Sequence, residues 1–495
     1  MKSLDGYIKD IEKELSSQKT SSREEEVGTL SEIRDGVAIV TGLREAFYGE
    51  IIEFQNGVSG FIIDLTEDVV GVVVLGDYLS LKAGTLAKAT GRLLSLPVSE
   101  KLLGRVVDPL SNALDGGAKI KSDKFYPLEK IAPGVVYRKS VSVPLQTGIK
   151  AIDAMIPIGR GQRELIIGDR ATGKTTIAID AIINQKTEGV ICIYCAIGQK
   201  NAKIASVIET LKKNKAMDYT IVVAAAASDS VALQYLAPYS ATAIAEYFLD
   251  QGKDVLVIYD DLSKHAWAYR QISLVLRRPA GREAYPGDIF YLHSRLLERS
   301  CRIDPKYGGG SITALPIIET LEGDISGYIP TNVISITDGQ LFLETELFNS
   351  DIRPAINVGT SVSRVGGSAQ TKAMKQVASG LKLDLAQYRS LAAFSQFESD
   401  LDEETKKSLN RGAKVTQILK QKKNEPYSLA EQVLVLWAAT HGFLDSMPQD
   451  EVGEFERKLL DALRTRKKDL LKKINKQKIL EGTDEKEIEK LVKSI

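Results

Sequence analysis

The chain contains 495 residues, which is too long for a single hydrophobic core and indicates roughly three domains. Its 65 lysines and arginines balance its 65 aspartates and glutamates, so no overall charge attracts nucleic acid or an anionic membrane. Three cysteines argue against a disulfide framework and for a reducing compartment. No apolar run approaches the roughly 18 residues of a membrane span, and the first residues lack a secretory signal. We therefore expect a soluble, intracellular protein, which could still bind peripherally to a membrane complex.

The first 25 residues are predicted to form a short amphipathic helix and a linker. Leu4, Ile8, Ile11 and Leu15 recur at helical spacing in a charged background, and a serine-rich stretch follows them. A single helix before a polar linker has no core of its own, so it either frays or docks on a partner.

Residues 26–90 have the pattern of a small antiparallel β-barrel. Short β-rich runs alternate there with glycine turns such as Asp35-Gly36 and Asn56-Gly57. Closely spaced strands with turns of this kind close readily into a barrel.

Residues 91–370 are expected to form an α/β domain with a mostly parallel sheet. Apolar strands at 220–223 and 255–259 flank a helical stretch at 230–249, and this alternation is typical of a sheet covered by helices on both faces. From residue 371 glycines become rare and long helical patterns follow, so residues 371–495 are predicted to form a helical bundle.

The segment Gly168–Thr175 fits the nucleotide-binding pattern G-x-x-x-x-G-K-[ST]. The apolar strand Leu165–Ile167 precedes it, and a helical pattern over 176–183 follows. In this setting backbone N–H groups wrap a phosphate, Lys174 reaches its outer oxygens, and the Thr175 hydroxyl is placed for Mg²⁺. The alternative is a glycine-rich turn that arose by chance, but the flanking strand and helix favour nucleoside triphosphate binding.

A second acidic contact for Mg²⁺ is expected at the end of a neighbouring strand. The apolar run Val255–Tyr259 ends in Asp260 and Asp261, at the carboxyl edge where open parallel sheets bind ligands. We take Asp260 as the first choice and Asp261 as the second. An aspartate after a strand is often only a helix cap, so this alternative stays open for either residue.

Five motifs in the chain resemble the α-subunit family of the F-type ATP synthases. They are GRVVDPL, GQRELIIGDRATGKTT, VLVIYDDLSKHAWAYRQ, LRRPAGREAYPGDIFYLHSRLLER and IRPAINVGTSVSRVGG. The resemblance extends over nearly the whole chain. It implies an N-terminal β-barrel, a central RecA-like phosphate-loop domain and a C-terminal helical bundle, in agreement with the patterns above. It also implies a nucleotide-binding but non-catalytic partner of the β subunit.

The resemblance bears on whether the chain's own site hydrolyses ATP. In the β subunit a glutamate activates the attacking water, and here the equivalent segment, expected to be a loop, is Ala196–Lys200 with Gln199. Glutamine cannot accept a proton at neutral pH, although it orients water in some GTPases, so slow turnover stays open on the residues alone. The resemblance favours a site that binds Mg-ATP and retains it.

Arg364 lies in the glycine-bordered segment Val362–Gly367. Taken alone, an arginine in such a turn is usually the donor of a structural salt bridge. The resemblance implies instead that Arg364 reaches across an interface to the γ-phosphate in the β subunit's site. The fork of a guanidinium fits phosphate oxygens and neutralises charge in the transition state.

The resemblance further implies that Phe348, Arg353, Pro354 and Gln421 lie beside the adenine, although each could be ordinary packing. Magnesium is expected on Thr175 and Asp260. The complete set expected to bind ATP or ADP is Gly168, Asp169, Arg170, Ala171, Thr172, Gly173, Lys174, Thr175, Thr176, Gln199, Phe348, Arg353, Pro354 and Gln421.

Two positions depart from the family pattern. Ala171 stands where the family's phosphate loop usually has glutamine, and Lys423 replaces the second glutamine beside the adenine. These changes leave the affinity of the site and its recognition of the base open.

The expected function is a non-catalytic, regulatory and structural Mg-ATP-binding subunit of a proton- or sodium-translocating rotary ATP synthase. The isolated chain is expected to be essentially inactive. Its implied partners are β subunits in an alternating three-plus-three hexamer, the central γ stalk, a δ-type stalk subunit at the N-terminal helix and, indirectly, the membrane sector, but no nucleic acid. The implied location is the cytoplasmic face of a bacterial inner membrane as a peripheral protein, or alternatively the stromal face of a thylakoid membrane.

Two other functions are compatible with a phosphate loop. A self-sufficient hexameric ATPase, such as a β-like or secretion-type motor, is disfavoured by Gln199 in place of glutamate. A ring helicase related to the transcription terminator also joins a small barrel to a RecA-like domain. Balanced charge and the lack of interleaved aromatic and basic residues argue against it.

Overall fold

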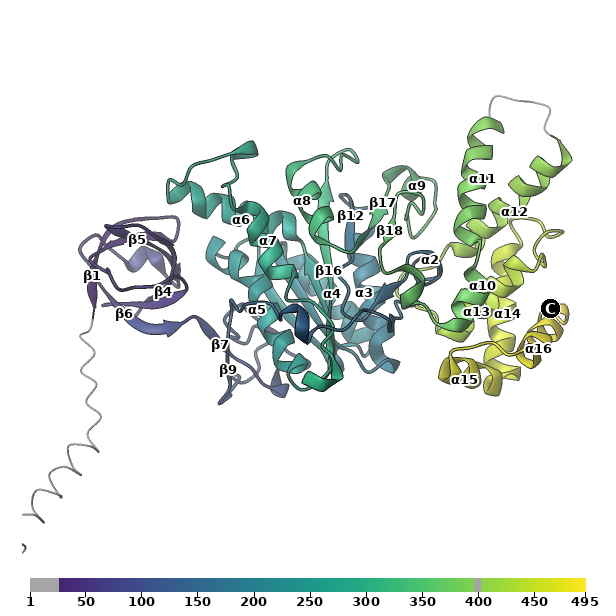
Figure 1. Ribbon diagram of the computed structural model, residues 1–495, viewed down its shortest axis with the longest axis horizontal. Coiled ribbons are helices and arrows are strands. Elements are labelled where there is room, and N and C mark those ends of the chain that lie inside the picture. The colour runs from purple at the N-terminus through teal and green to yellow at the C-terminus, as the bar shows by residue number, and fades with distance from the viewer. Residues whose placement is uncertain (1–25, 396–401) are drawn as a thin grey trace, which may run out of the picture. The chain divides into compact units, whose positions relative to one another are not determined.

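A computed structural model describes residues 26–395 and 402–495, with side chains up to residue 392 in the first range. The chain divides into two compact units, residues 1–94 and 95–495 (Figure 1). The predicted helix and linker of residues 1–25 lie outside the described residues. Within the described ranges, no helix combines the length and the apolar character needed to cross a membrane.

The first unit contains a closed antiparallel barrel with the strand order β1-β2-β5-β4-β3-β6. Its strands are β1 Val27–Arg34, β2 Val37–Thr41, β3 Glu50–Phe54, β4 Ser59–Leu65, β5 Val69–Leu75 and β6 Leu86–Leu93. Leu30, Val40, Ile52 and Ile62 fill its interior. A Cβ added at Gly60 would lie 2.6 Å from a Val72 methyl carbon, so glycine is needed for the strands to pack. The predicted barrel is confirmed, and β6 continues past residue 90 to Leu93.

The second unit is built on an eight-stranded sheet with the order β18-β17-β12-β16-β15-β13-β14-β8. Neighbouring strands are parallel, except that β18 pairs antiparallel with β17 at one edge. The strands are β8 Val106–Val107, β12 Leu165–Asp169, β13 Ile191–Gln199, β14 Thr220–Ala226, β15 Asp254–Asp260, β16 Ser311–Thr320, β17 Gly339–Leu343 and β18 Val362–Ser363. The expected parallel sheet is therefore confirmed.

Helices alternate with the strands of this domain. They are α2 Lys150–Met155, α3 Lys174–Asn184, α4 Asn201–Lys213, α5 Val231–Leu249, α6 Leu262–Val275, α7 Ile289–Leu297, α8 Tyr328–Ile336 and α9 Thr345–Asn349. Of these, α3, α4, α5, α6 and α8 contact strands of the sheet. Alternate residues of the strands, such as Cys192, Val222 and Leu256, share one core with α3 and α4. Because side chains alternate along a strand, the residues between these point to the opposite face of the sheet. Helix α5 contacts β13, β14, β15 and β16.

The C-terminal part is helical, as predicted. Its helices are α10 Lys372–Ala378, α11 Leu381–Ser395, α12 Glu403–Leu419, α13 Leu429–Thr440, α14 Val452–Arg466, α15 Lys468–Gln477 and α16 Gly482–Lys493. Helix α13 is buried along most of its length and joins the same core as α3 and α4. Buried Lys150 of α2 forms an ion pair with Glu456 of α14, and Gln432 Nε2 donates to Asp153 Oδ2 at 2.8 Å. These contacts fix the C-terminal helices on the nucleotide domain.

Candidate nucleotide-binding site

The phosphate loop joins strand β12, which lies inside the sheet between β17 and β16, to the start of α3 at Lys174. A Cβ at Gly168 would lie 2.4 Å from the Leu343 carbonyl oxygen, so only glycine fits beside β17. Gly173 has a φ of 101°, in the left-handed region that glycine favours, and it turns the chain into the helix. The loop thus has the strand–turn–helix arrangement that points backbone N–H groups at a phosphate.

Lys174 is buried and folds back on its own loop. Its Nζ donates to the carbonyl oxygens of Gly168 at 2.6 Å and Asp169 at 2.5 Å. Burial lowers the pKa of this ammonium group. A phosphate placed on the loop would give the ammonium group anionic acceptors in place of these two neutral ones, and charge-assisted hydrogen bonds are the stronger kind.

The other expected loop residues differ in their exposure. Arg170 and Ala171 are exposed, and Ala171 has a φ of 66°, a left-handed conformation that a residue with a Cβ adopts rarely. Thr172 is buried and donates to the Asp169 carbonyl oxygen at 2.8 Å, while Thr176 is half-buried in the first turn of α3. The structure therefore places all of these residues on one continuous loop at the start of the helix.

The two residues expected to hold Mg²⁺ are adjacent. Thr175 Oγ1 donates to Asp260 Oδ2 at 2.7 Å, and Tyr194 OH donates to the same oxygen at 2.8 Å. Asp261, the second choice, is the N-cap of α6, where its Oδ1 accepts from the Lys264 backbone at 2.9 Å. A hydroxyl and one carboxylate beside a phosphate loop fit Mg²⁺, which takes few protein ligands and completes its shell with phosphate oxygens and water.

Gln199 is not in a loop, as the sequence suggested, but is the last residue of strand β13. The pairing of β13 with β14 continues through this segment, with an irregularity at Gly198, whose φ is 59°. The bulge points the Gln199 amide at both aspartates: Nε2 lies 2.7 Å from Asp260 Oδ1 and 3.3 Å from Asp261 Oδ2. The Gln199 amide therefore holds both carboxylates in place.

Replacing Gln199 by glutamate is expected to destabilise the isolated chain by about 2 kcal/mol, because a buried donor becomes a third carboxylate. Neighbouring negative charge would raise the pKa of the new carboxyl above its unfolded value. The part of the deficit that comes from this charge is then absent below the unfolded pKa, grows as the pH rises from the unfolded to the folded pKa, and is complete above the folded pKa. Thermal melting of variant and wild type should therefore differ more at pH 8 than at pH 5. Gln271→Glu on the exposed face of α6 is the control, and equal deficits at both pH values would contradict the placement.

Contacts around these residues include groups that the sequence did not single out. Lys203 Nζ donates to Gln199 Oε1 at 3.1 Å. Asp169 Oδ1 accepts from Thr320 Oγ1 at 2.7 Å, and Asp169 Oδ2 accepts from Thr345 Oγ1 at 3.2 Å. No motif marks these hydroxyls, because they come from separate strands and helices that meet only at the carboxyl edge of the folded sheet.

Phe348 and Arg353, expected at the base, lie beyond the carboxyl end of β17. The Arg353 guanidinium carbon lies 4.5 Å from the centre of the Phe348 ring, and the Arg353–Pro354 peptide bond is cis. The Gln421 backbone N–H donates to the Arg353 carbonyl oxygen at 2.8 Å. The structure thus brings together residues from two segments that are distant in sequence.

The Gln421 side chain is engaged by backbone groups. Its Nε2 donates to the carbonyl oxygens of Gly148 at 2.8 Å and Glu425 at 2.9 Å, and its Oε1 accepts from the Lys150 N–H at 3.1 Å. These bonds use both donors of the amide. In this arrangement Gln421 fixes the shape of the loop and offers no free N–H to a base. Lys423, two residues on, is exposed.

Arg364 follows β18, at the sheet edge where Ser363 pairs with Gly339. Gly339 begins β17, so Arg364 lies at the amino end of the parallel strands, whereas the phosphate loop follows their carboxyl end. Strand β12 alone separates these ends by about 15 Å. The Arg364 side chain is exposed, and among the described residues it has no hydrogen-bond or ion-pair partner.

The backbone under Arg364 is firmly held. Its N–H donates to the Asp338 carbonyl oxygen at 2.8 Å, and Ser363 Oγ donates to the Pro157 carbonyl oxygen at 2.7 Å. Gln162 Nε2 links Ser363 Oγ to the fully buried Glu164, whose pKa is raised well above its usual range by burial. The charge of Arg364 acts on Glu164, but the guanidinium forms no ion pair with any described residue, unlike the structural salt bridge that a turn arginine usually makes.

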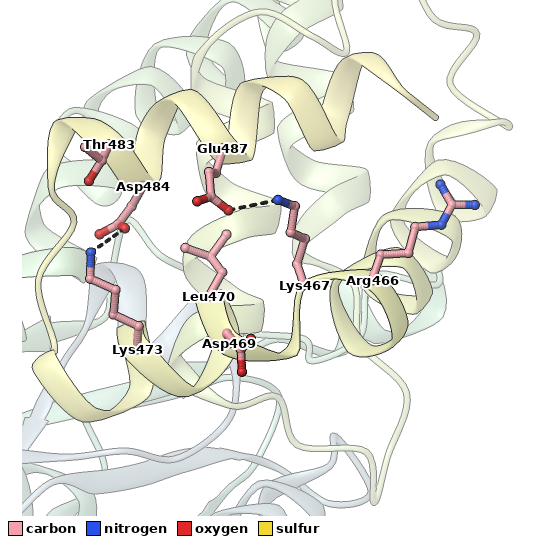
Figure 2. A pocket seen from close by; sticks show the side chains of 8 residues that line it. All are labelled: Arg466, Lys467, Asp469, Leu470, Lys473, Thr483, Asp484 and Glu487. Atoms are coloured by element: carbon pink, nitrogen blue, oxygen red, sulfur yellow. Dashed lines mark hydrogen bonds and ion pairs between the residues drawn. The ribbon is translucent and has the colours of Figure 1, made fainter.

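A separate cavity of about 350 Å³ lies between α15 and α16. Figure 2 shows Lys473 pointing at Asp484 and Lys467 at Glu487, while Arg466 points away. The lining contains three basic residues and three acidic residues, so its charges balance. The basic residues are Arg466, Lys467 and Lys473, and the acidic residues are Asp469, Asp484 and Glu487. The lining therefore offers no surplus of charge to a phosphate, in contrast to the loop around Lys174.

Comparisons with known proteins agree with this geometry. The ATP synthase alpha/beta family models match residues 24–91 as the beta-barrel domain, 148–363 as the nucleotide-binding domain and 370–495 as the C terminal domain. The chain is 56% identical over 492 residues to ATP synthase subunit alpha of Petrotoga mobilis, covering 99% of this chain and 97% of that protein. It is 59% identical over 460 residues to ATP synthase subunit alpha of Dehalococcoides mccartyi, covering 93% and 92%. The resemblance inferred from the motifs is confirmed, and the chain belongs to the family of ATP synthase alpha subunits.

Proposed function

We propose that this chain is the non-catalytic, regulatory and structural Mg-ATP-binding subunit of a rotary ATP synthase, and that it supplies Arg364 to the catalytic site of a neighbouring β subunit. The observation that carries the proposal is the position of Arg364. It is exposed, has no partner among the described residues, and lies at the opposite end of the sheet from the chain's own phosphate loop. It is therefore suited to a site on another subunit.

The chain's own site is proposed to bind Mg-ATP. The backbone N–H groups of the loop and Lys174 would hold the phosphates, while Thr175 and Asp260 would hold Mg²⁺, which neutralises phosphate charge when bound. Gln199 supports a non-catalytic role, since its amide is bonded to both aspartates and cannot take a proton from water. Phe348, Arg353 and Pro354 would flank the base.

At the β site, the role proposed for Arg364 is electrostatic. Charge spreads over the transferring phosphoryl oxygens in the transition state, and a guanidinium fork presents two parallel N–H donors to such oxygens. The bonds of Ser363 and of the Arg364 N–H fix the backbone, so less conformational freedom is lost when the side chain engages a phosphate. The subunit thus contributes to catalysis at a site that it does not contain.

The proposal extends to the surroundings of the chain. We place it in an alternating hexamer with β subunits, around a γ stalk, with a δ-type stalk subunit at residues 1–25. The complex would couple ATP synthesis or hydrolysis to proton or sodium transport at a membrane sector. The chain would then be peripheral to a bacterial inner membrane, on its cytoplasmic face.

The test is nucleotide binding and turnover by the purified chain without β. It is expected to bind Mg-ATP, while its steady-state hydrolysis stays at least about 10³-fold below that of the head reassembled with β. Calorimetric titration and a coupled phosphate assay measure the two quantities. Robust hydrolysis by the isolated chain would favour a self-sufficient ATPase and overturn the proposal, as would failure to bind nucleotide at all.

A further inference from the structure

Asp180 is an acidic side chain buried in the helix that follows the phosphate loop. It lies in α3, about 7.5 Å along the helix axis from Thr175, and is only 6% exposed. Among the residues that the structure describes, no lysine or arginine forms an ion pair with it. Burial raises its pKa to about 7. Burying a carboxyl group without a cation nearby costs free energy unless the group is hydrogen-bonded, so its hydrogen-bond partner matters for the stability of this region.

That partner is the loop between α12 and α13. Asp180 Oδ1 accepts a hydrogen bond from the Asn424 backbone N–H at 2.8 Å. Asn424 has a φ of 61°, a left-handed conformation that asparagine tolerates better than most residues, so the loop turns sharply at this point. The carboxyl group therefore holds the loop at its turn.

The same loop carries Gln421, whose backbone N–H donates to the Arg353 carbonyl oxygen at 2.8 Å. The loop is thus hydrogen-bonded at two points. At Gln421 it is bonded to Arg353, whose guanidinium stacks on Phe348, and at Asn424 it is bonded to α3. Helix α3 begins at Lys174, so a single rigid element carries both a phosphate ligand and the anchor of this loop.

We propose that Asp180 is a positioning residue for the base end of the nucleotide site, setting the distance between the phosphate loop and the segment 420–424. The inference rests on the proposed nucleotide binding and extends it. Asp180 does not contact the nucleotide; it fixes the loop whose Gln421 backbone N–H holds Arg353 beside the base. Its loss should weaken binding of a nucleotide and leave binding of a bare polyphosphate unchanged.

The experiment compares Mg-ATP with magnesium tripolyphosphate, which lacks the base and ribose, in titrations of the isolated full-length chain. Asp180→Leu, which has a similar size and no acceptor, is expected to lower the ATP affinity about tenfold with tripolyphosphate affinity unchanged. Asp180→Asn keeps an acceptor oxygen and is expected to bind ATP within about twofold of wild type. Lys213→Ala, an exposed residue at the end of α4 and outside the site, is the control and should leave the preference for ATP over tripolyphosphate as in wild type.

Three outcomes overturn the inference. ATP binding by Asp180→Leu equal to wild type shows that the anchor has no effect on the base end. Equal losses for both ligands show a purely structural role. A wild-type chain that binds neither ligand overturns the nucleotide-binding proposal as well, which separates the two failures. If Asp180→Leu does not fold, Asp180→Ser, which is too short to reach Asn424, is measured with the same expectations.

Discussion

Replacing Arg364 by lysine is expected to lower multi-site ATP hydrolysis of the head assembled with β by about 10³-fold or more. The substitution keeps the charge but loses the fork that bonds two phosphate oxygens at once. Because the side chain has no partner among the described residues, the variant should fold and assemble normally. Nucleotide should still bind in β, since other groups hold the phosphates of the ground state. Tight binding of Mg-ADP-fluoroaluminate, which mimics the transition state, should be lost.

Turnover and fluoroaluminate trapping are measured on the same assembled sample. Arg466→Lys is the matched control, because Arg466 is another exposed arginine without an ion-pair partner in the described part of the chain. A structural role for Arg364 would appear as lost assembly or lower thermal stability, with near-normal turnover in the complex that survives. Wild-type values for both measurements would remove Arg364 from the β site.

Much of the fold could be predicted from local pattern. The short β-rich runs and glycine turns of the barrel, the alternation of strand and helix, and the phosphate-loop motif are each encoded within short segments, and the structure contains all three. The position of Asp260 beside the phosphate loop could also be predicted, because an apolar strand that ends in a carboxylate places it at the carboxyl edge of a parallel sheet. Which aspartate caps the helix could not be selected, since that depends on the backbone conformation of Asp260 and Asp261.

The bonding partners of the site depended on tertiary structure. Gln199 was singled out as a replacement for glutamate, but its contact with Asp260 requires the bulge at Gly198, which no local pattern indicates. The Gln421 amide was expected at a base, yet Gly148 and Lys150, far away in sequence, engage it. Asp180 drew no attention because a single acid in an apolar helix resembles any solvated residue until its burial is known.

Replacing Lys174 by methionine is expected to reduce Mg-ATP binding by the isolated chain about 100-fold or more. The change removes the only ammonium group on the phosphate loop and keeps the length of the side chain. Charge-assisted hydrogen bonds to phosphate contribute about 1.5–3 kcal/mol each, and two lost bonds account for an effect of this size. Arg170 is the other cation of the loop. Its side chain is exposed and, among the described residues, donates no hydrogen bond to the carbonyl groups of the loop.

The fold should tolerate this substitution, because among the described residues the Lys174 ammonium group donates hydrogen bonds only to the Gly168 and Asp169 carbonyl oxygens of its own loop. The melting temperature should therefore change by no more than about 2 °C, and titration of the variant with Mg-ATP reports on binding alone. Ile177→Val, a buried neighbour in the first turn of α3 that lies outside the expected binding set, is the control and should bind as wild type does. Retained affinity in Lys174→Met would show that the backbone N–H groups hold the phosphates without the ammonium group. An equal loss in both variants would point to disruption of the start of α3, so the pair of variants separates the charge from the helix.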